Sequence, residues 1–186
     1  DTGIIEVNID TDDDLLEDNR AYTVIKKDEL YRALLVSEGN IFLEKALEQY
    51  PGLEVVRMES STESLSGYDV YVLDGVELEV MPKDGHIMVL DPNVDTDIFR
   101  IHESGEFKPG KIEVLRSSLA DELLAFTTLQ DIYIAEAKLL SPLNWAETVL
   151  KSGDHPLLLA GETDDRKTVI FPFDIQRSDL PLKADF

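Results

Sequence analysis

Two aspartates have positions from which a carboxylate can bind a ligand. Asp74 and Asp91 each follow an apolar run and begin a turn, which continues with Gly75 in the first case and reaches Asn93 in the second. If both runs are parallel strands, their carboxyl ends share the edge at which open α/β sheets bind ligands. We therefore take Asp74, Gly75, Asp91 and Asn93 as candidate binding residues and expect the two carboxylates to lie close together. Asp-Gly and Asp-Pro are also common turn formers, and a purely structural pair should be spread apart or neutralised by a basic neighbour.

The acidic stretch from Asp10 to Asp18 has part of the pattern of a calcium-binding loop. Its aspartates at alternate positions provide the oxygen ligands that calcium prefers: Asp10, Asp12 and Asp14. Leu15 stands where such a loop needs glycine, and Ala21 stands where it needs a bidentate glutamate. We interpret the stretch as a solvated acidic turn and predict no metal site, although weak cation binding there remains open.

The segment GEFKPGKI, from Gly105 to Ile112, fits a phosphate-binding loop up to its last position. A true loop of this kind needs a Ser or Thr hydroxyl there and a helix that begins at the phosphates. Ile112 occupies that position instead, Pro109 stiffens the loop, and the following IEVL has a strand pattern. We interpret the segment as a turn that leads into a strand.

A complete catalytic set is missing from the sequence. The chain has no cysteine, no G-x-S-x-G elbow and no G-x-G-x-x-G loop. Its three histidines lie in different segments and have no neighbouring nucleophile or metal-ligand spacing: His86, His102 and His155. We predict no catalytic residue, no cofactor and no metal centre, although partners brought together by folding remain open.

Charge and hydropathy exclude two classes of partner. The 39 acidic and 17 basic residues give a formal charge of -22, which repels the phosphates of nucleic acids and anionic lipids. Hydrophobic residues make up 43% of the 186 residues, which is enough for a packed core. No apolar run reaches the roughly 20 residues of a membrane-spanning helix. We expect a folded domain that neither binds nucleic acid nor inserts into a membrane by itself.

The periodicity of the chain predicts an α/β fold. Residues 4–9 and 21–25 indicate a β-hairpin with a long loop, and IFLEKALEQY at 41–50 has helical spacing. Short apolar runs typical of a parallel sheet covered on both faces occur at 33–36, 53–58, 68–73 and 86–90. Further strands are expected at 97–101 and 112–115, and a helix at 118–126. From Asp131 onward, β-type segments dominate, and the turn ETDDRK joins the last two.

An ordered series of segments resembles a known family. RALLVSEGNIFLEKALEQYPGLEVVRM, YDVYVLDG, HIMVLDP, DIYIAEA, PLLLAGE and FDIQRSDLPLKADF are similar to the glutamine-amidotransferase-like domain of bacterial Bat-type aerotolerance membrane proteins. The resemblance implies a flavodoxin-like open parallel sheet of the class I amidotransferase type over residues 29–186, with a β-rich C-terminal half. It makes residues 1–28 a β-hairpin that ends a preceding β-sandwich segment, and it places a membrane helix just after Phe186.

The sequence departs from the enzymes of that fold class at the nucleophile. Class I amidotransferases use a cysteine in a tight turn after a sheet strand, together with a later His and Glu. The comparable turn here is Asp91-Pro92-Asn93, and the late segment FDIQRSD offers Asp174 and Asp179 but no His-x-Glu. Without a thiol, glutaminase activity is excluded, and only the fold is carried over.

These observations lead to a functional expectation with two competitors. We expect a non-catalytic interaction or scaffolding domain of a membrane-anchored von Willebrand factor A-type protein, placed outside the cytoplasm. Its partners would be another protein or other domains of the same membrane-anchored chain. One alternative is a carboxylate-centred, metal-assisted hydrolase at Asp74 and Asp91. The other is a sensor of small ligands or glycans at the same sheet edge.

Overall fold

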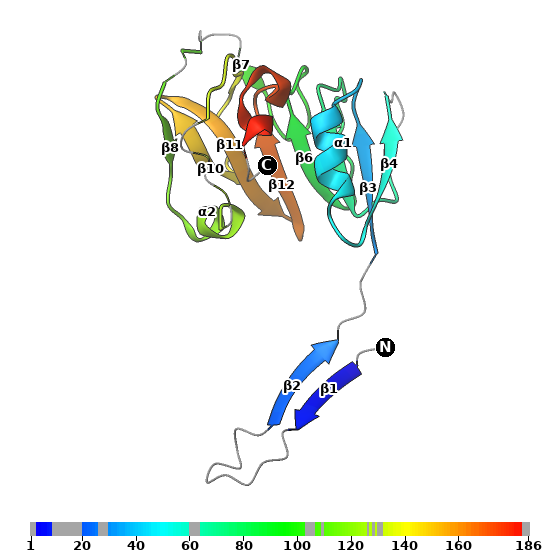
Figure 1. The fold of residues 1–186 in the computed structure, drawn as a ribbon. Coiled ribbons are helices and arrows are strands. Elements are labelled where there is room, and N and C mark those ends of the chain that lie inside the picture. Colours follow the sequence, from blue (N-terminus) through cyan, green and yellow to red (C-terminus); the bar gives the residue numbers. More distant parts are fainter. Residues whose placement is uncertain are drawn as a thin grey trace. The chain divides into compact units, whose positions relative to one another are not determined.

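The computed structural model describes residues 3–8, 20–25, 30–59, 64–102, 107–108, 110–125, 127, 129 and 132–183. The chain forms two compact units, Asp1–Leu30 and Tyr31–Phe186 (Figure 1). No helix in the described part is long and apolar enough to cross a membrane.

The first unit is a two-stranded hairpin. Strands β1 (Gly3–Asn8) and β2 (Arg20–Ile25) pair antiparallel, so the predicted hairpin is confirmed. Ile5 and Val7 lie on one face of β1, and both side chains are exposed. The acidic stretch from Asp10 to Asp18 lies outside the described residues. The assignment of residues 1–28 to a preceding β-sandwich stays a prediction.

The second unit is built on one eight-stranded sheet, in the order β4-β3-β5-β6-β12-β11-β10-β8. Its first five strands are parallel: β4 (Leu53–Met58), β3 (Tyr31–Val36), β5 (Val70–Asp74), β6 (His86–Leu90) and β12 (Arg166–Phe171). Numbered along the chain, their order is 2-1-3-4-5, which is the flavodoxin-like order. The predicted α/β class with an open parallel sheet is therefore confirmed.

The remaining strands extend the sheet with antiparallel pairs. They are β11 (His155–Thr163), β10 (Ala146–Ser152) and β8 (Ile112–Val114), and a separate small pair joins β7 (Ile101–His102) to β9 (Leu139–Leu140). Asp164 and Asp165 form the two-residue loop between β11 and β12, with φ of 52° and 60°. Two positive φ values are the mark of a type I′ hairpin turn, so the predicted turn and β-rich C-terminal half are confirmed.

The parallel strands carry apolar side chains to both faces of the sheet. In the apolar runs expected to form the parallel sheet, Val70 is half-buried, and five other side chains are at most 3% exposed: Leu34, Val36, Val72, Ile87 and Val89. Leu35 and Val72 pack on one face with Leu43 of α1, whereas Leu34 and Tyr71 pack on the other. The helical segments α1, α2, η1 and η2 cover the first of these faces (Figure 1). Coverage of both faces explains why these strands are continuously apolar.

Short helices begin at capping residues. Helix α1 (Ile41–Glu48) begins after Asn40, whose side chain accepts a hydrogen bond from the Leu43 amide, and α2 (Ser118–Leu123) begins after Ser117 in the same way. Two 3-10 helices follow β12, η1 (Ile175–Arg177) and η2 (Leu180–Leu182). Helix α1 confirms the prediction at 41–50, while α2 ends at Leu123 rather than at residue 126.

Two strand predictions were wrong over most of their length. Residues 97–101 were expected to be extended, but the Thr96 hydroxyl accepts hydrogen bonds from the amides of Ile98 and Phe99, which bends the chain. Only Ile101 of that stretch belongs to a strand. In the β-type segment expected after Asp131, residues 132–140 form a strand only at Leu139–Leu140. Ile134 makes an isolated antiparallel bridge with Ser178, and this pairing cannot extend because Ser178 lies between the two 3-10 helices. At Ile112, by contrast, the predicted strand is present as β8.

Candidate functional site

The candidate site lies where the direction of chain progression in the sheet reverses. From β3, the chain moves to β4 on one side, and then crosses back to β5 on the other. In open α/β sheets, the crevice at the carboxyl ends of two such strands is the usual place of ligand binding. A pocket of about 250 Å³ occupies this crevice and contains all four candidate residues, together with Ser37, Glu38, Gly39, Asp174 and Gln176. We call it the sheet-edge pocket.

Asp74 ends β5 and is held by two donors. Its Oδ2 accepts hydrogen bonds from Ser37 Oγ at 2.7 Å and from Asn40 Nδ2 at 3.1 Å. Burial raises the pKa of Asp74, while these two hydrogen bonds act in the opposite direction and the charges of Asp174 and Asp91 add to the rise. Asp74 therefore binds a proton more strongly in the folded protein than it would in water.

Asn40 was missed by the sequence analysis and links the pocket to helix α1. Its side chain is fully buried, and while Nδ2 donates to Asp74, Oδ1 accepts from the Leu43 amide at 3.3 Å. One amide thus fixes both the start of the helix and the orientation of the carboxylate. The run Ser-Glu-Gly-Asn between an apolar strand and a helical pattern is a recognisable N-cap signal, and it could have identified this residue.

Asp91 follows β6 in an unusual backbone conformation. Its φ is 47°, in the left-handed region that residues with a side chain rarely adopt, and its amide donates to the Phe171 carbonyl at 3.0 Å. Its Oδ1 lies 2.7 Å from Nζ of Lys138. Asp91 therefore has the basic neighbour that we expected of a structural pair, whereas Asp74 is held by the neutral donors of Ser37 and Asn40.

Lys138 joins two loops of the site, and no pattern in the sequence identified it. Its Nζ donates to Asn93 Oδ1 at 2.5 Å, and Asn93 Nδ2 in turn donates to the Gly75 carbonyl at 2.7 Å. Gly75 has a φ of 65°. The turn after β5 and the turn after β6 are therefore connected through one amide to a lysine from the β-rich half. The structure brings the four candidate residues together, and their role in binding stays a prediction.

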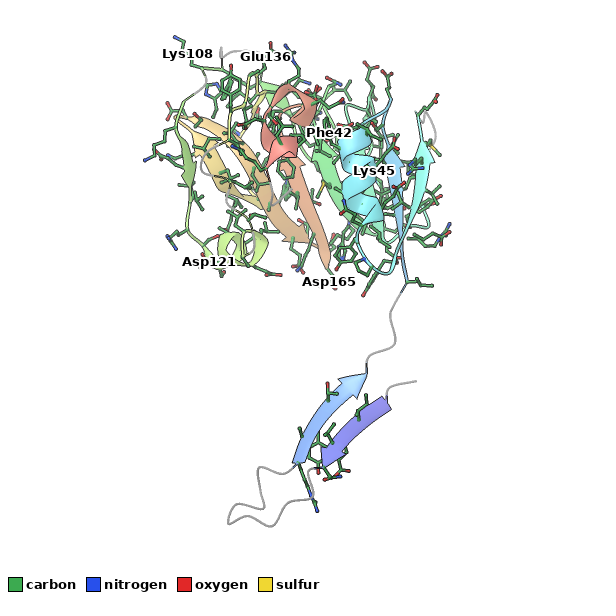
Figure 2. The ribbon with its side chains drawn as sticks, in the orientation of Figure 1. Phe42, Lys45, Lys108, Asp121, Glu136 and Asp165 are labelled. Atoms are coloured by element: carbon green, nitrogen blue, oxygen red, sulfur yellow. The ribbon has the colours of Figure 1, made fainter. Side chains whose placement is uncertain are left out.

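A larger cavity of about 680 Å³ adjoins the sheet-edge pocket, and we call it the groove. The two share Asp91, Asn93 and Asp174. Arg177 lines the groove and donates to Glu136 from both terminal nitrogens, at 2.7 and 2.8 Å. Figure 2 shows Glu136 at the carboxyl end of the parallel strands and Asp165 at the opposite end. The groove therefore extends the site along the same edge of the sheet.

The histidines do not contribute to the site. His86 begins β6 at the opposite end of that strand and accepts a hydrogen bond from the Lys167 amide at 3.1 Å. His102 lies in β7, and the His155 ring packs edge-on against Phe107 at 5.5 Å. Within the described ranges, no group of three or more His, Cys, Asp or Glu side chains is arranged to hold a metal ion.

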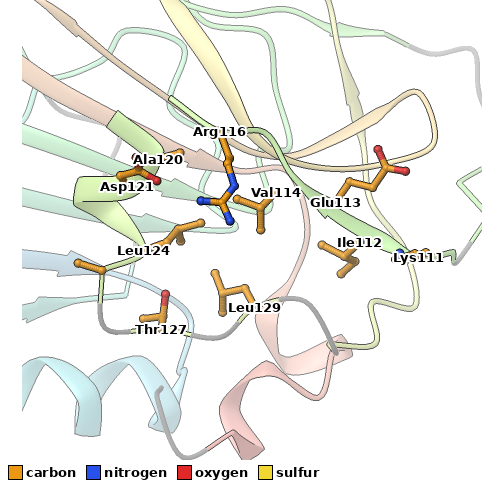
Figure 3. A pocket seen from close by; sticks show the side chains of 11 residues that line it. Lys111, Ile112, Glu113, Val114, Arg116, Ala120, Asp121, Leu124, Thr127 and Leu129 are labelled. Carbon is orange, nitrogen blue, oxygen red and sulfur yellow. The ribbon is translucent and has the colours of Figure 1, made fainter. Parts of the chain in front are cut away.

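A further cavity, of about 590 Å³, lies at the other end of the strand order (Figure 3). Edge strand β8, helix α2 and the residues after it line the cavity, with Ile112, Val114 and Leu124 among its apolar side chains. The Arg116 guanidinium points into it (Figure 3). None of the four candidate residues lines this cavity.

Comparison with known proteins reveals the fold but no family. No protein-family model and no curated protein matches this chain. Among solved structures, it is similar to Cytoplasmic Protein STM3548 from Salmonella typhimurium, with a TM-score of 0.52 and 15% identity over 93% of this chain and 85% of that one. Cytoplasmic Protein STM1381 from Salmonella typhimurium LT2 gives 0.51, with 10% identity over 94% and 86%. An exo-beta-1,4-mannosidase from Opitutaceae bacterium strain TAV5 gives 0.50, with 12% identity over 80% of this chain but 32% of that one. At such identities, the likeness shows a shared α/β fold alone.

Proposed function

We propose that this chain is a non-catalytic binding module whose ligand occupies the sheet-edge pocket and the adjoining groove. The main support is the position of this pocket at the switch point of the sheet, where Asp74, Asp91 and Asn93 converge. The pocket and the groove together have the size of ordinary small-molecule sites, and both combine polar groups with fixed orientations.

The contacts of the two aspartates favour binding over catalysis. Asp91 stands at the turn where the class I enzymes place their nucleophile, and its carboxylate is occupied by an ion pair with the Lys138 ammonium. Asp74 keeps Oδ2 occupied by Ser37 and Asn40, while the described contacts leave its Oδ1 for a ligand. Asp74 is thus oriented by the protein in the way that a binding site requires, whereas Asp91 has the basic neighbour of a structural carboxylate.

The proposed setting of the module rests on the family resemblance. We propose that it belongs to a membrane-anchored von Willebrand factor A-type protein and works outside the cytoplasm. In that setting, another protein or other domains of the same membrane-anchored chain would be its partners, while the pocket and the groove hold its ligand. The ordered segments from RALLVSEGN to FDIQRSDLP support this proposal, and the strand order of residues 31–171 agrees with it.

The hydrolase alternative draws on the three aspartates of the pocket. Asp74, Asp91 and Asp174 line the same cavity, and the charges of the last two raise the pKa of the first. Repulsion of this kind is relieved by a bound cation, but these carboxylates are not arranged as a metal-ligand group, so the metal-assisted hydrolase has less support than the binding module.

The test combines ligand mapping with melting curves. A small-fragment library is screened against the isotope-labelled protein by amide chemical shifts, and we expect hits to move the signals of Gly75, Asn93 and Lys138. Asp74→Asn should weaken those hits, while Asp165→Asn, in the exposed hairpin turn, should leave them unchanged. Hits confined to the cavity beside α2 would contradict the proposal. A calcium- or magnesium-induced rise in melting temperature that Asp74→Asn and Asp91→Asn abolish would establish the metal-site alternative instead.

A further inference from the structure

Four of the five charged side chains that the structure describes in the groove form two ion pairs. Lys138 pairs with Asp91 at 2.7 Å, and Arg177 holds Glu136 through two parallel hydrogen bonds. The two pairs therefore present donors and acceptors side by side, and Asp174 is the one further charged side chain among the described residues of the cavity wall. This balance is unusual in a chain whose formal charge is -22.

Apart from Asn93 and Asp174, the rest of the groove is apolar and partly aromatic. Phe107 is half-buried and lines the cavity, and Ala135, Ala137 and Pro172 add small apolar surfaces. Phe173 is buried and packs edge-on against Phe171 at 5.9 Å, so this wall is fixed by the core. A ligand that fills the groove thus meets an apolar wall together with the two ion pairs.

We propose that the groove binds a neutral, hydroxyl-rich ligand, namely a short carbohydrate; this inference rests on the proposed binding function and specifies its ligand class. A sugar hydroxyl donates one hydrogen bond and accepts up to two, so each hydroxyl can bridge a carboxylate and a cation that already lie together. Hydrogen bonds to charged groups are the stronger kind. The apolar C–H faces of a sugar ring can pack on the Phe107 ring, as apolar surface does on aromatic side chains.

Charged ligands fit the groove less well. An anion must compete with Asp91 or Glu136 for its cation, and it would leave a carboxylate without its partner. The acidic side chains of the adjoining sheet-edge pocket, Glu38, Asp74 and Asp174, also repel an anion. A cationic ligand that takes Asp91 or Glu136 would leave Lys138 or Arg177 without its partner, and of the charged groups described in the groove only Asp174 lies outside the two ion pairs. A neutral polyol keeps both ion pairs intact.

The test uses defined sugars on the whole chain. Cellobiose, maltose and di-N-acetylchitobiose serve as neutral probes, and galacturonate and glucosamine serve as anionic and cationic comparators. We expect at least one neutral probe to shift the amide signals of Ala137, Lys138 and Asp174. It should bind at least about 5-fold more tightly than either comparator, the ratio that one ordinary hydrogen bond supplies. Saturation-transfer spectra of the bound sugar give an independent readout.

Three variants assign the effect to the groove. Arg177→Met should weaken the neutral probe by at least about 5-fold, and Arg177→Lys should have an intermediate effect, because lysine keeps the charge but loses the two-pronged donor. Lys151 on β10 forms a similar ion pair with Glu113 on β8, at 3.6 Å. Because this pair lies outside the groove, Lys151→Met should leave binding of the neutral probe unchanged. Melting curves confirm that each variant is folded, since the Arg177 side chain is 57% exposed.

Each outcome decides the inference. If a charged comparator binds as tightly as the neutral sugars, or if Arg177→Met binds the neutral probe unchanged, the carbohydrate inference is wrong. If no sugar binds while other fragments shift Gly75 and Asn93, the inference is wrong and the binding module stands. If neither sugars nor fragments shift this edge of the sheet, both proposals are wrong.

Discussion

Nζ of Lys138 lies 2.7 Å from Oδ1 of Asp91, and this ion pair connects the segment before β9 to the turn after β6. Both side chains are largely withdrawn from water, with exposures of 31% and 28%. The pair therefore differs from a surface salt bridge, because removing one partner leaves a desolvated charge behind.

Lys138→Met tests this connection. We expect the free energy of unfolding to fall by about 1–3 kcal/mol, because the variant leaves Asp91 without its charged partner and Asn93 without one donor. The measurement is urea unfolding at neutral pH. Lys151→Met, in the more exposed pair with Glu113, should cost less than about 1 kcal/mol. Equal losses in both variants would show that the Lys138–Asp91 pair contributes no more to the free energy of unfolding than an exposed ion pair does.

The ionisation of Asp74 should lower the free energy of unfolding as the pH rises. Its pKa in the folded protein is raised above the ordinary value of 3.8, mainly by burial, so the folded state holds its proton longer than the unfolded state does. The contribution of the Asp74 proton to the free energy of unfolding is fully present below pH 3.8, and it is lost as the pH rises through the pKa of the folded protein. The stability of Asp74→Asn relative to the parent should therefore increase over that window, as measured by unfolding at a series of pH values. A flat difference would contradict the raised pKa.

Asp84 supplies a matched control with the opposite sign. Its pKa is lowered by hydrogen bonds from the Gly67 amide and the Tyr71 hydroxyl, both at 2.7 Å. Its stabilising contribution is present above the ordinary pKa and is lost as the pH falls through the folded value. Asp84→Asn should therefore be most destabilised, relative to the parent, at neutral pH, and the difference should shrink in acid.

Tyr71→Phe tests a buried hydroxyl. Tyr71 is fully buried, donates to Asp84 at 2.7 Å and accepts from the Tyr68 amide at 3.2 Å. We expect a loss of about 1–3 kcal/mol in unfolding free energy, because the Tyr68 amide loses its acceptor. Burial also raises the pKa of Tyr71 to about 12, so ultraviolet titration should find it among the last tyrosines to ionise. Tyr50→Phe, at a side chain that is 64% exposed, should change neither stability nor the late phase of the titration.

Gly85→Ala tests the tight crossover before β6. Gly85 has a φ of 64°, and an added Cβ would collide with the backbone carbonyl oxygen of Tyr68. Gly153 has a similar φ of 58° but open space around it. Gly153→Ala should therefore cost only the backbone strain of about 1–2 kcal/mol, and Gly85→Ala should cost clearly more. Thermal unfolding of the two variants compares them directly, and equal costs would argue against the collision.

The strands of the second unit were largely predictable because local signals specify them. Continuous apolar runs such as Leu34–Val36 indicate burial on two faces, and Asp164-Asp165 is a turn by composition. The same local rules placed Asp74 and Asp91 at strand ends, where the structure has them. Where a side chain redirects the backbone, as Thr96 does, an extended pattern misleads.

The rest of the site depends on contacts between distant segments. Lys138 lies 47 residues from Asp91, and nothing in the surrounding sequence indicates that it meets that turn. The sequence of the late strands predicts antiparallel pairing, and β11 does pair antiparallel with β12. The same sequence gives no sign that β12 also pairs in parallel with β6. That second pairing brings Asp174 to the pocket, and it is decided by packing in the sheet rather than by local preference.

The pairing of β6 with β12 also sets the order in which the molecule can form. Strands β3 to β6 occupy residues 31–90 and can associate early during synthesis, whereas β12 follows only at Arg166–Phe171. The hairpin of β11 and β12 closes locally and fast, but its docking on β6 must first close a loop of residues 91–165, which slows folding. Asp174 and Arg177 come after β12 in the chain. A nascent chain can therefore form the four parallel strands β3 to β6 before the residues that complete the groove have been synthesised. We expect ligand binding only after β12 has paired with β6.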